Sequence, residues 1–214
     1  VFRFPLPYMR LDGFDPDDLA VEDADLELVD EWVLSRLQTV TAEMTEHWDE
    51  FRQDKALHTF LEFVVDDVSR FYIQVVRERM WEEEDSASKR AAYATFYHVL
   101  TDLIALLAPY APFVSEEIYQ NLTGDAGHDS VHMLDWPEPN ADLQDEQLET
   151  DVAVLRAVEE AGSNARQQAE RKLRWPVQRI VVDATDERTV EAVERHGDLL
   201  ADRLNARDVE LVGP

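Results

Sequence analysis

The 214 residues include 47 aspartates and glutamates but only 20 lysines and arginines, so the formal net charge is -27. Because 45% of the residues are hydrophobic, the chain can fill the core of one large domain, or of a domain with a small appendage, which excludes a disordered acidic tail. The absence of cysteine excludes disulfides, thiolate catalysis and cysteine-ligated zinc.

The basic residues are mostly arginine, with lysine only at positions 55, 89 and 172. At ordinary ionic strength so negative a chain would repel nucleic acid. In molar salt the Debye length falls to about 3 Å, so the overall field is screened while contacts at hydrogen-bond distance survive. We interpret the acidity as adaptation to a salt-saturated cytoplasm rather than to a cationic partner, and we expect a cytoplasmic protein.

Residues 1–24 are expected to be extended or irregular, because Pro5, Pro7, Gly13 and Pro16 interrupt them. A first helix is predicted over about 25–47, where apolar residues recur at helical spacing. A second helix is predicted over about 54–82. The residues expected to face its core side are Leu57, Leu61, Val64, Val68, Phe71 and Val75.

A third helix is predicted from Ser86 or Ser88 to just before Pro109, and a fourth over 113–122, closed by Thr123 and Gly124. Four amphipathic helices with short connections are typical of a helical bundle. The longest apolar run, at 103–114, contains two prolines and is too short to span a bilayer, so no membrane association is expected.

The composition changes near residue 138. A long polar helix is predicted over about 145–171, and two strand-like runs, 177–184 and 207–212, flank helical residues 186–204. Strand, helix and strand in that order favour a parallel pair. The sequence thus predicts a mostly α protein, with a helical bundle at 1–137 and a small α+β extension at 138–214.

Catalytic motifs are absent from the sequence. There is no glycine-rich phosphate loop, no GxSxG and no HExxH. The six histidines are scattered and are expected to be structural or exposed, while carboxylate pairs are too common in so acidic a chain to be informative. We therefore expect no catalytic residue, no metal site and no cofactor in this chain.

The stretch SRFYIQVVRERMW, residues 69–81, concentrates arginine and aromatic side chains. Stepping 100° per residue places a set of side chains opposite the core stripe: Phe63, Asp66, Arg70, Gln74, Arg77 and Trp81. Such an outward strip can bind phosphates and stack unpaired bases of RNA. The alternative is an ion pair between Asp66 and Arg70, with Trp81 buried against a neighbouring helix. Arg79 lies nearer the core and is expected to form a structural ion pair.

A second basic cluster, ERKLRWPVQRI at 170–180, surrounds Trp175. Its basic residues are Arg171, Lys172, Arg174 and Arg179. They could contact an RNA backbone or pair with neighbouring acidic side chains, and the sequence leaves both possibilities open.

Several phrases, in order, carry a resemblance to a known family: DEWVLSRL (30–37), LAPYAPFVSEEIYQNLTG (107–124) and SVHMLDWP (130–137). They resemble the anticodon-binding helical domain of class I aminoacyl-tRNA synthetases of the isoleucyl, valyl, leucyl and methionyl subgroup. The phrase at 72–100 and the tail at 162–182 and 200–212 are similar to isoleucyl-tRNA synthetases of the archaeal and eukaryotic type. Together with the acidity, this suggests a haloarchaeal source.

The resemblance implies a fragment of an enzyme that ligates isoleucine to tRNA(Ile) with ATP and Mg²⁺. The catalytic domain, with its HIGH and KMSKS sequences, and the editing domain would lie outside this chain. The fragment would then be non-catalytic and free of cofactor. Its partners would be the tRNA(Ile) anticodon stem-loop and the catalytic domain of the same chain, in a monomeric enzyme.

The outward strip supplies the main candidates for tRNA binding, with three weaker candidates elsewhere. In order, they are Arg70, Gln74, Arg77 and Trp81, then Arg36, Lys172 and Arg174. Two alternatives remain open at this point. One is the same region of a valyl-tRNA synthetase, and the other is a standalone helical module that binds protein and no RNA.

Overall fold

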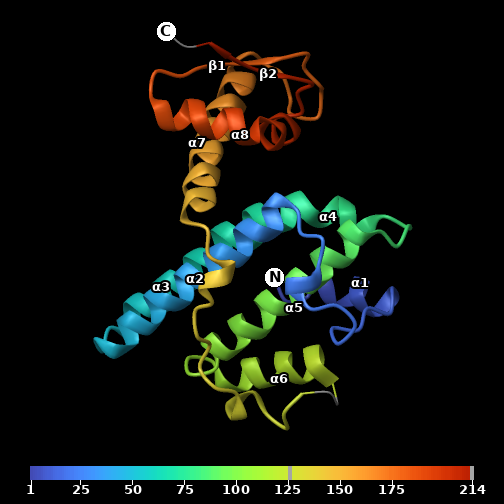
Figure 1. Cartoon of the computed structure of the whole chain (residues 1–214), viewed down its shortest axis with the longest axis vertical. Coiled ribbons are helices and arrows are strands. Elements are labelled where there is room, and N and C mark those ends of the chain that lie inside the picture. Colours follow the sequence, from blue (N-terminus) through green and yellow to red (C-terminus); the bar gives the residue numbers. More distant parts are fainter. Residues whose placement is uncertain (125–126, 213–214) are drawn as a thin grey trace. The chain divides into compact units, whose positions relative to one another are not determined.

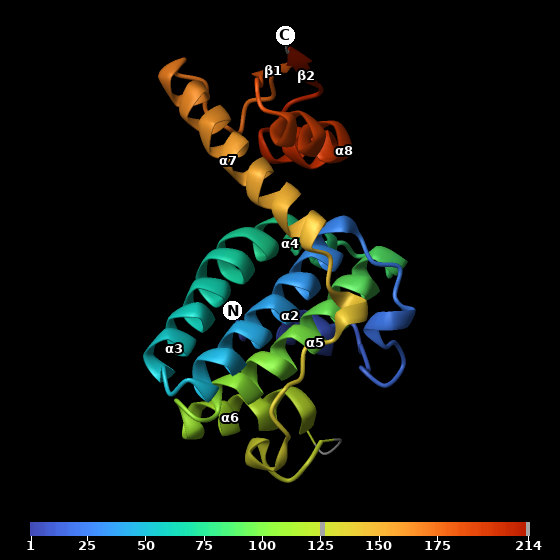
Figure 2. The same ribbon diagram turned by 60° about the vertical axis from the view of Figure 1, so that its left-hand side comes forward.

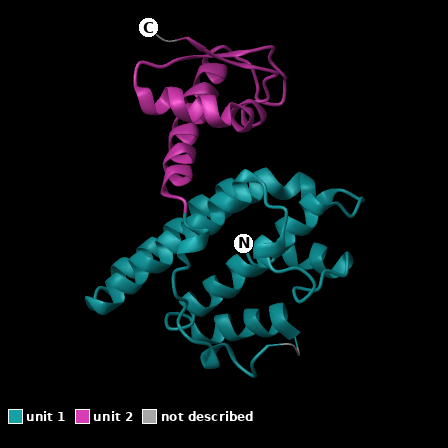
Figure 3. Ribbon diagram, viewed as in Figure 1, with its two compact units in different colours: residues 1–144 teal, residues 145–214 magenta. Residues whose placement is uncertain are grey.

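The computed structural model describes residues 1–124 and 127–212. The chain divides into two compact units, Val1–Gln144 and Asp145–Pro214 (Figures 1 and 3). Most described residues are helical, and a two-stranded sheet lies in the second unit, which confirms the predicted mostly α class. None of the described helices combines the length and apolar character needed to cross a membrane.

The division between the units falls later in the chain than the expected boundary at 137/138, because the residues beyond it still pack on the first unit. The backbone N–H of Asn140 donates to the Oε1 of Gln38 at 2.8 Å. The side chain of Gln144 donates to the Oγ1 of Thr39 at 3.3 Å. We therefore propose to divide the chain after Gln144.

The first unit is a bundle of helices. They are α1 (Pro5–Leu11), α2 (Leu28–Asp49), α3 (Gln53–Glu62), α4 (Ile73–Trp81), α5 (Ala87–Leu107) and α6 (Pro112–Thr123). A π-helical segment, Phe63–Tyr72, joins α3 to α4, and 3-10 turns lie at Val21–Asp23, Val131–Met133 and Ala141–Leu143. Figure 2 shows α2 lying between α3 and α5, and it packs against both.

The core of this unit is formed largely by aliphatic and aromatic side chains of α2, α5 and the π-helical segment. The expected stripe of α2 is buried from Val29 to Met44. Trp32 meets Phe71 edge-on, with ring centroids 4.9 Å apart. Such aromatic pairs add about 0.5–1.5 kcal/mol to the stabilisation that comes from burial alone.

The predicted ends of α5 and α6 are confirmed. The side chain of Ser86 accepts a hydrogen bond from the backbone N–H of Lys89 at 3.1 Å, so it caps the N-terminus of α5. Gly124 follows the last residue of α6 with φ at 56°, a conformation that disfavours residues with a Cβ. The start of α5 and the end of α6 are therefore set by the residues at those positions.

The expectation of irregular structure at residues 1–24 is wrong for its first part, because Pro5–Leu11 form α1. Pro5 and Pro7 do not interrupt this helix. Both lie in the first turn of α1, where backbone N–H groups have no partner within the helix and proline removes nothing. Met9 is buried, which anchors this short helix to the bundle.

The predicted second helix forms one continuous helical run, but its middle part, Phe63–Tyr72, is π-helical. In a π-helix each backbone N–H reaches back five residues, so each turn is wider than the 3.6 residues of an α-helix. The side chains after it are rotated relative to an uninterrupted α-helix. The buried positions therefore keep a spacing of four: Val68, Tyr72, Val76 and Met80.

Three predictions about which side chains face the core are wrong, because one helical wheel was drawn across α3 and α4, which the π-helical segment rotates relative to each other. Phe63 was placed outward but is only 1% exposed, and Leu61 was placed inward but is 48% exposed. Val75 was predicted to face the core, but it is only half-buried, and its neighbour Val76 is fully buried instead. A helical wheel with a fixed step of 100° cannot represent the wider turns.

The second unit contains α7 (Glu146–Gln168), β1 (Ile180–Asp183), α8 (Glu187–Arg203) and β2 (Val209–Val212). The two strands pair in parallel, with Ile180 opposite Val209, which confirms the predicted pairing. The helices α7 and α8 pack against each other, and their apolar side chains form a small core with the strands. Asp145 caps α7 by accepting from the backbone N–H of Leu148 at 2.9 Å.

Candidate nucleic-acid interface

The outward strip begins at Arg70, at the end of the π-helical segment. Its side chain is 73% exposed, and its Nη1 lies 2.7 Å from the Oδ1 of Asp66, one helical turn earlier. This is the ion pair that the alternative interpretation of the strip predicted. An exposed pair of this kind contributes about 0–1 kcal/mol, so a phosphate can compete for the guanidinium at little cost.

Gln74, Arg77 and Trp81 form a connected row on α4. The Nη1 of Arg77 donates to the Oε1 of Gln74 at 3.0 Å. The guanidinium carbon of Arg77 also lies 5.8 Å from the centroid of the Trp81 ring, within cation–π range. The Arg77 side chain is thereby held between an amide and an aromatic ring.

Trp81 is exposed rather than buried against a neighbouring helix, since 54% of its surface is accessible. Its indole N–H donates to the hydroxyl of Tyr8 at 2.9 Å. Tyr8 belongs to α1, so this bond joins the end of the strip to a segment that the sequence predicted to be irregular. Tyr8 was missed for that reason.

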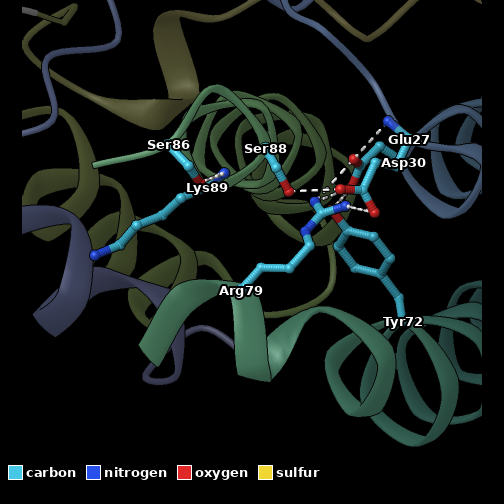
Figure 4. A network of polar contacts seen from close by, with 7 residues as sticks. All are labelled: Glu27, Asp30, Tyr72, Arg79, Ser86, Ser88 and Lys89. Carbon is cyan, nitrogen blue, oxygen red and sulfur yellow. Dashed lines mark hydrogen bonds and ion pairs between the residues drawn. The ribbon is translucent and has the colours of Figure 1, made fainter. Parts of the chain in front are cut away.

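A polar network around the buried Asp30 and Tyr72 fixes the opposite side of α4 (Figure 4). Arg79 places its Nη2 2.8 Å from the Oδ2 of Asp30 and its Nη1 2.6 Å from the Oε2 of Glu27. The hydroxyl of Tyr72 donates to the Oδ1 of Asp30 at 2.6 Å, and Ser88 donates to Glu27 at 2.5 Å. This confirms that Arg79 is a structural residue, and it ties α4 to α2 and α5.

The protonation of this network follows from burial and pairing. Burial raises the pKa of Asp30 even though Arg79 and Tyr72 act to lower it. Burial and the neighbouring Asp30 raise the pKa of Tyr72 well above its ordinary value. Burial acts to lower the pKa of Arg79, but Asp30 and Tyr72 outweigh it and the pKa rises. Arg79 therefore stays charged, and its ion pairs hold α4 in place.

Arg36 does not join the outward strip. It lies on α2, and its Nε is 3.2 Å from the Oδ2 of Asp67, a residue of the π-helical segment whose side chain is only 11% exposed. Arg36 therefore links two packed helices, and Asp67 compensates its charge.

Lys172 and Arg174 belong to the second unit, whereas the strip belongs to the first. Both side chains are exposed, in the segment between α7 and β1. Trp175 beside them is 49% exposed. The structure thus presents a basic and aromatic loop here, as the sequence suggested.

Arg166 holds this loop and was not foreseen from the sequence. It is only 6% exposed, at the end of α7. Its guanidinium donates to the backbone carbonyls of Lys172, Leu173, Trp175 and Leu204. Because these carbonyls face inward, the side chains of the loop can face solvent. The only sign of this role in the sequence is an arginine on the inner face of a polar helix.

The described residues contain no group of three or more histidine, aspartate or glutamate side chains able to hold a metal ion. The arrangement that they do present is a row on α4 formed by the exposed Gln74, the half-buried Arg77 and the exposed ring of Trp81, held in place by an ion-pair network around the buried Asp30. Guanidinium and amide groups bind phosphates and base edges, and an exposed indole stacks on an unpaired base. This combination suits a single-stranded loop of RNA.

Comparisons with known proteins agree with this chemistry. Residues 30–182 match the family model described as the anticodon-binding domain of tRNA ligase. The whole chain is 72% identical to an isoleucine-tRNA ligase of Natronomonas pharaonis, and 66% identical to one of Haloarcula marismortui. It is 44% identical, again over its full length, to an isoleucine-tRNA ligase of Methanosarcina acetivorans.

The chain spans about a fifth of the length of these relatives, 20–21% in each of the three. Two of these isoleucine-tRNA ligases come from salt-loving archaea, which fits the acidic composition. The family model covers well over half of the chain, from the start of α2 to β1. The chain therefore belongs to the family of anticodon-binding domains of tRNA ligases.

Proposed function

We propose that this chain is the tRNA-binding region of an isoleucine-tRNA ligase and that it holds the anticodon stem-loop of tRNA(Ile). The row formed by Gln74, Arg77 and Trp81 carries the proposal, because it combines phosphate and base-edge donors with an exposed ring. The parent enzyme would ligate isoleucine to its tRNA in the cytoplasm, as a monomer that uses ATP and Mg²⁺. Its catalytic and editing domains would lie in the rest of the polypeptide.

The role of such a region is differential binding. Contacts made at the anticodon loop favour the cognate tRNA and so direct its acceptor end to a distant catalytic domain of the same polypeptide. Arg70, Arg77 and Gln74 would bind phosphates or base edges, and Trp81 would stack on a loop base. Arg36, Lys172 and Arg174 would make weaker contributions, Arg36 least because Asp67 already pairs with it.

Single substitutions in the row test the proposal. In molar KCl we expect Arg77→Ala and Trp81→Ala each to weaken binding of a tRNA(Ile) transcript about tenfold, as one lost base or phosphate contact would. Fluorescence anisotropy of labelled transcript measures this loss. Arg3→Ala is the matched control, since it removes an exposed arginine of the same unit outside the row.

Circular dichroism of each variant separates binding from folding, because loss of helicity would show that the side chain belongs to the core. A transcript with its isoleucine anticodon changed to a valine anticodon should bind less tightly. Preference for the valine anticodon would instead assign the chain to a valyl enzyme, although the relatives that it matches are named isoleucine-tRNA ligases. Absence of saturable tRNA binding would support a helical protein-interaction module.

A further inference from the structure

A hollow lies at the end of the strip, between α1 and the C-terminal end of α4. It has a volume of about 500 Å³, within the range of about 300–1,000 Å³ that is usual for small-molecule sites. We name it the Tyr8–Trp81 hollow. Its lining includes Tyr8, Leu11, Met80, Trp81, Glu82 and Glu83.

The walls of the hollow are suited to a flat, uncharged ring. Leu11 is 82% exposed and Trp81 is 54% exposed, so two large apolar side chains face solvent at the same place. Met80 is buried behind them. The hydrogen bond from the Trp81 indole to Tyr8 fixes the indole against α1. An aromatic ring that is both exposed and held in one orientation is a ready platform for stacking.

The charge at the hollow excludes a phosphate. The carboxylates of Asp12, Glu82 and Glu83 line it, and the one amine there, that of Lys89, is already engaged. The Nζ of Lys89 lies 2.5 Å from the Oδ2 of Asp12 and donates to the backbone carbonyl of Glu82 at 2.7 Å. An anion would meet net negative charge, whereas a group with N–H donors would meet acceptors.

Two carboxylates remain available for such donors. Glu82 and Glu83 are exposed, and within the described parts of the chain neither forms an ion pair. In contrast, Lys89 and Tyr93 hold the carboxylate of Asp12, and their hydrogen bonds lower its pKa. A charged carboxylate accepts hydrogen bonds from N–H groups more strongly than a neutral acceptor does.

We propose that the Tyr8–Trp81 hollow binds one unpaired guanine of an RNA loop, stacked on Trp81, with its N1–H and N2 amino group donating to Glu82 or Glu83. Guanine fits because its Watson–Crick edge places two N–H donors side by side, where the other bases offer only one donor group on that edge. The proposal rests on the proposed RNA-binding function and names the base that the end of the strip would read.

Replacing guanosine by inosine removes only the 2-amino group and so tests the carboxylate contact. The probe is a hairpin RNA with the anticodon loop of an isoleucine tRNA, in which each loop guanosine is replaced in turn. In molar KCl we expect one replacement to weaken binding to the unmodified chain about tenfold, the loss typical of one base-edge contact. In the Glu82→Gln/Glu83→Gln double variant the same replacement should change affinity less than about twofold.

Glu78→Gln is the matched control, because Glu78 is an exposed carboxylate of α4 that does not line the hollow. This variant should discriminate guanosine from inosine as strongly as the unmodified chain does. Equal binding of the guanosine and inosine hairpins by the unmodified chain, at every loop position, would overturn the guanine site. So would undiminished discrimination in the double variant.

The two proposals fail in different ways. If the unmodified chain binds the hairpin and Arg77→Ala weakens that binding, but inosine has no effect, only the guanine site is wrong. If the unmodified chain binds no hairpin at all, the proposed function and the guanine site are both wrong. Circular dichroism at each step checks that the variants keep their helices.

Discussion

Arg79 and Trp81 are two residues apart on α4 and have opposite roles. The Arg79 side chain is 12% exposed and pairs with the fully buried Asp30, whereas Trp81 is exposed beside a hollow. A buried ion pair adds little net stability, because desolvation offsets the attraction. Removing one partner is costly, however, since the other charge is then buried alone. A substitution that removes one member of this pair, on the inner side of α4, is therefore expected to destabilise the fold.

We expect Arg79→Met to lower the free energy of unfolding by about 3 kcal/mol at neutral pH, because it leaves Asp30 buried without its cation. Urea unfolding followed by circular dichroism measures the loss. Arg77→Met on the same helix should cost less than about 1 kcal/mol, since its partners are exposed. The double variant Asp30→Leu/Arg79→Met should regain most of the loss, and a further loss there would contradict this account.

The loss in Arg79→Met should also depend on pH. Burial already raises the pKa of Asp30 with Arg79 present, and without Arg79 the pKa rises further. A carboxyl group with a higher pKa in the folded state than in the unfolded state binds its proton more readily when folded. Stability of the variant therefore falls as pH rises through that folded-state pKa, and the difference from the unmodified chain shrinks at lower pH. Urea titrations at several pH values measure this trend.

At the scale of elements, α7 and α8 approach closely at Gly162. A Cβ at this position would lie 2.6 Å from the Cδ1 of Leu204, which is fully buried. Helix propensity alone favours alanine over glycine by about 1 kcal/mol. Contact with a buried side chain acts in the opposite direction, because overpacking typically costs about 1–3 kcal/mol.

We expect Gly162→Ala to destabilise the second unit by about 1 kcal/mol, and Leu204→Ala to cost less in that background than alone, because the added methyl group occupies part of the vacated space. Hydrogen exchange of the amides of α7 and α8 measures both effects. Gly197→Ala is the control, since a Cβ there would meet only the Cγ1 of Val193 at 4.0 Å. Stabilisation by Gly162→Ala would show that the contact yields easily.

For the whole molecule, a net charge of -27 on 214 residues makes self-repulsion a major destabilising effect at low ionic strength. Raising KCl from about 0.1 M to about 1 M shortens the Debye length from roughly 10 Å to roughly 3 Å. We expect the thermal midpoint, followed by circular dichroism, to rise by about 5 °C or more, which corresponds to a gain of about 2 kcal/mol. Sucrose at equal osmolality should raise it less, and an unchanged midpoint in KCl would contradict the interpretation of the acidity.

The sequence by itself determined the elements whose cause is local. Ser86 at the start of α5, Gly124 as a terminator and the stripe of α2 follow from short-range rules, and the parallel direction of the two strands follows from the strand–helix–strand order, although not their register. The outward positions of Arg70, Gln74 and Trp81 were predicted and all three are exposed, whereas Arg77, which was predicted to face outward with them, is half-buried.

Only the tertiary structure decided which other side chains meet. The π-helical segment moved burial from Val75 to Val76, and its rings pack on α2 and α5, Phe71 against Trp32 and Tyr72 against Phe96, but no local signal specifies its wider turns. Tertiary packing also brings Tyr8 to Trp81, and Arg79 to Asp30, across long sequence separations. Sequence patterns report the face of a helix, whereas a hollow between two helices exists only once both are packed.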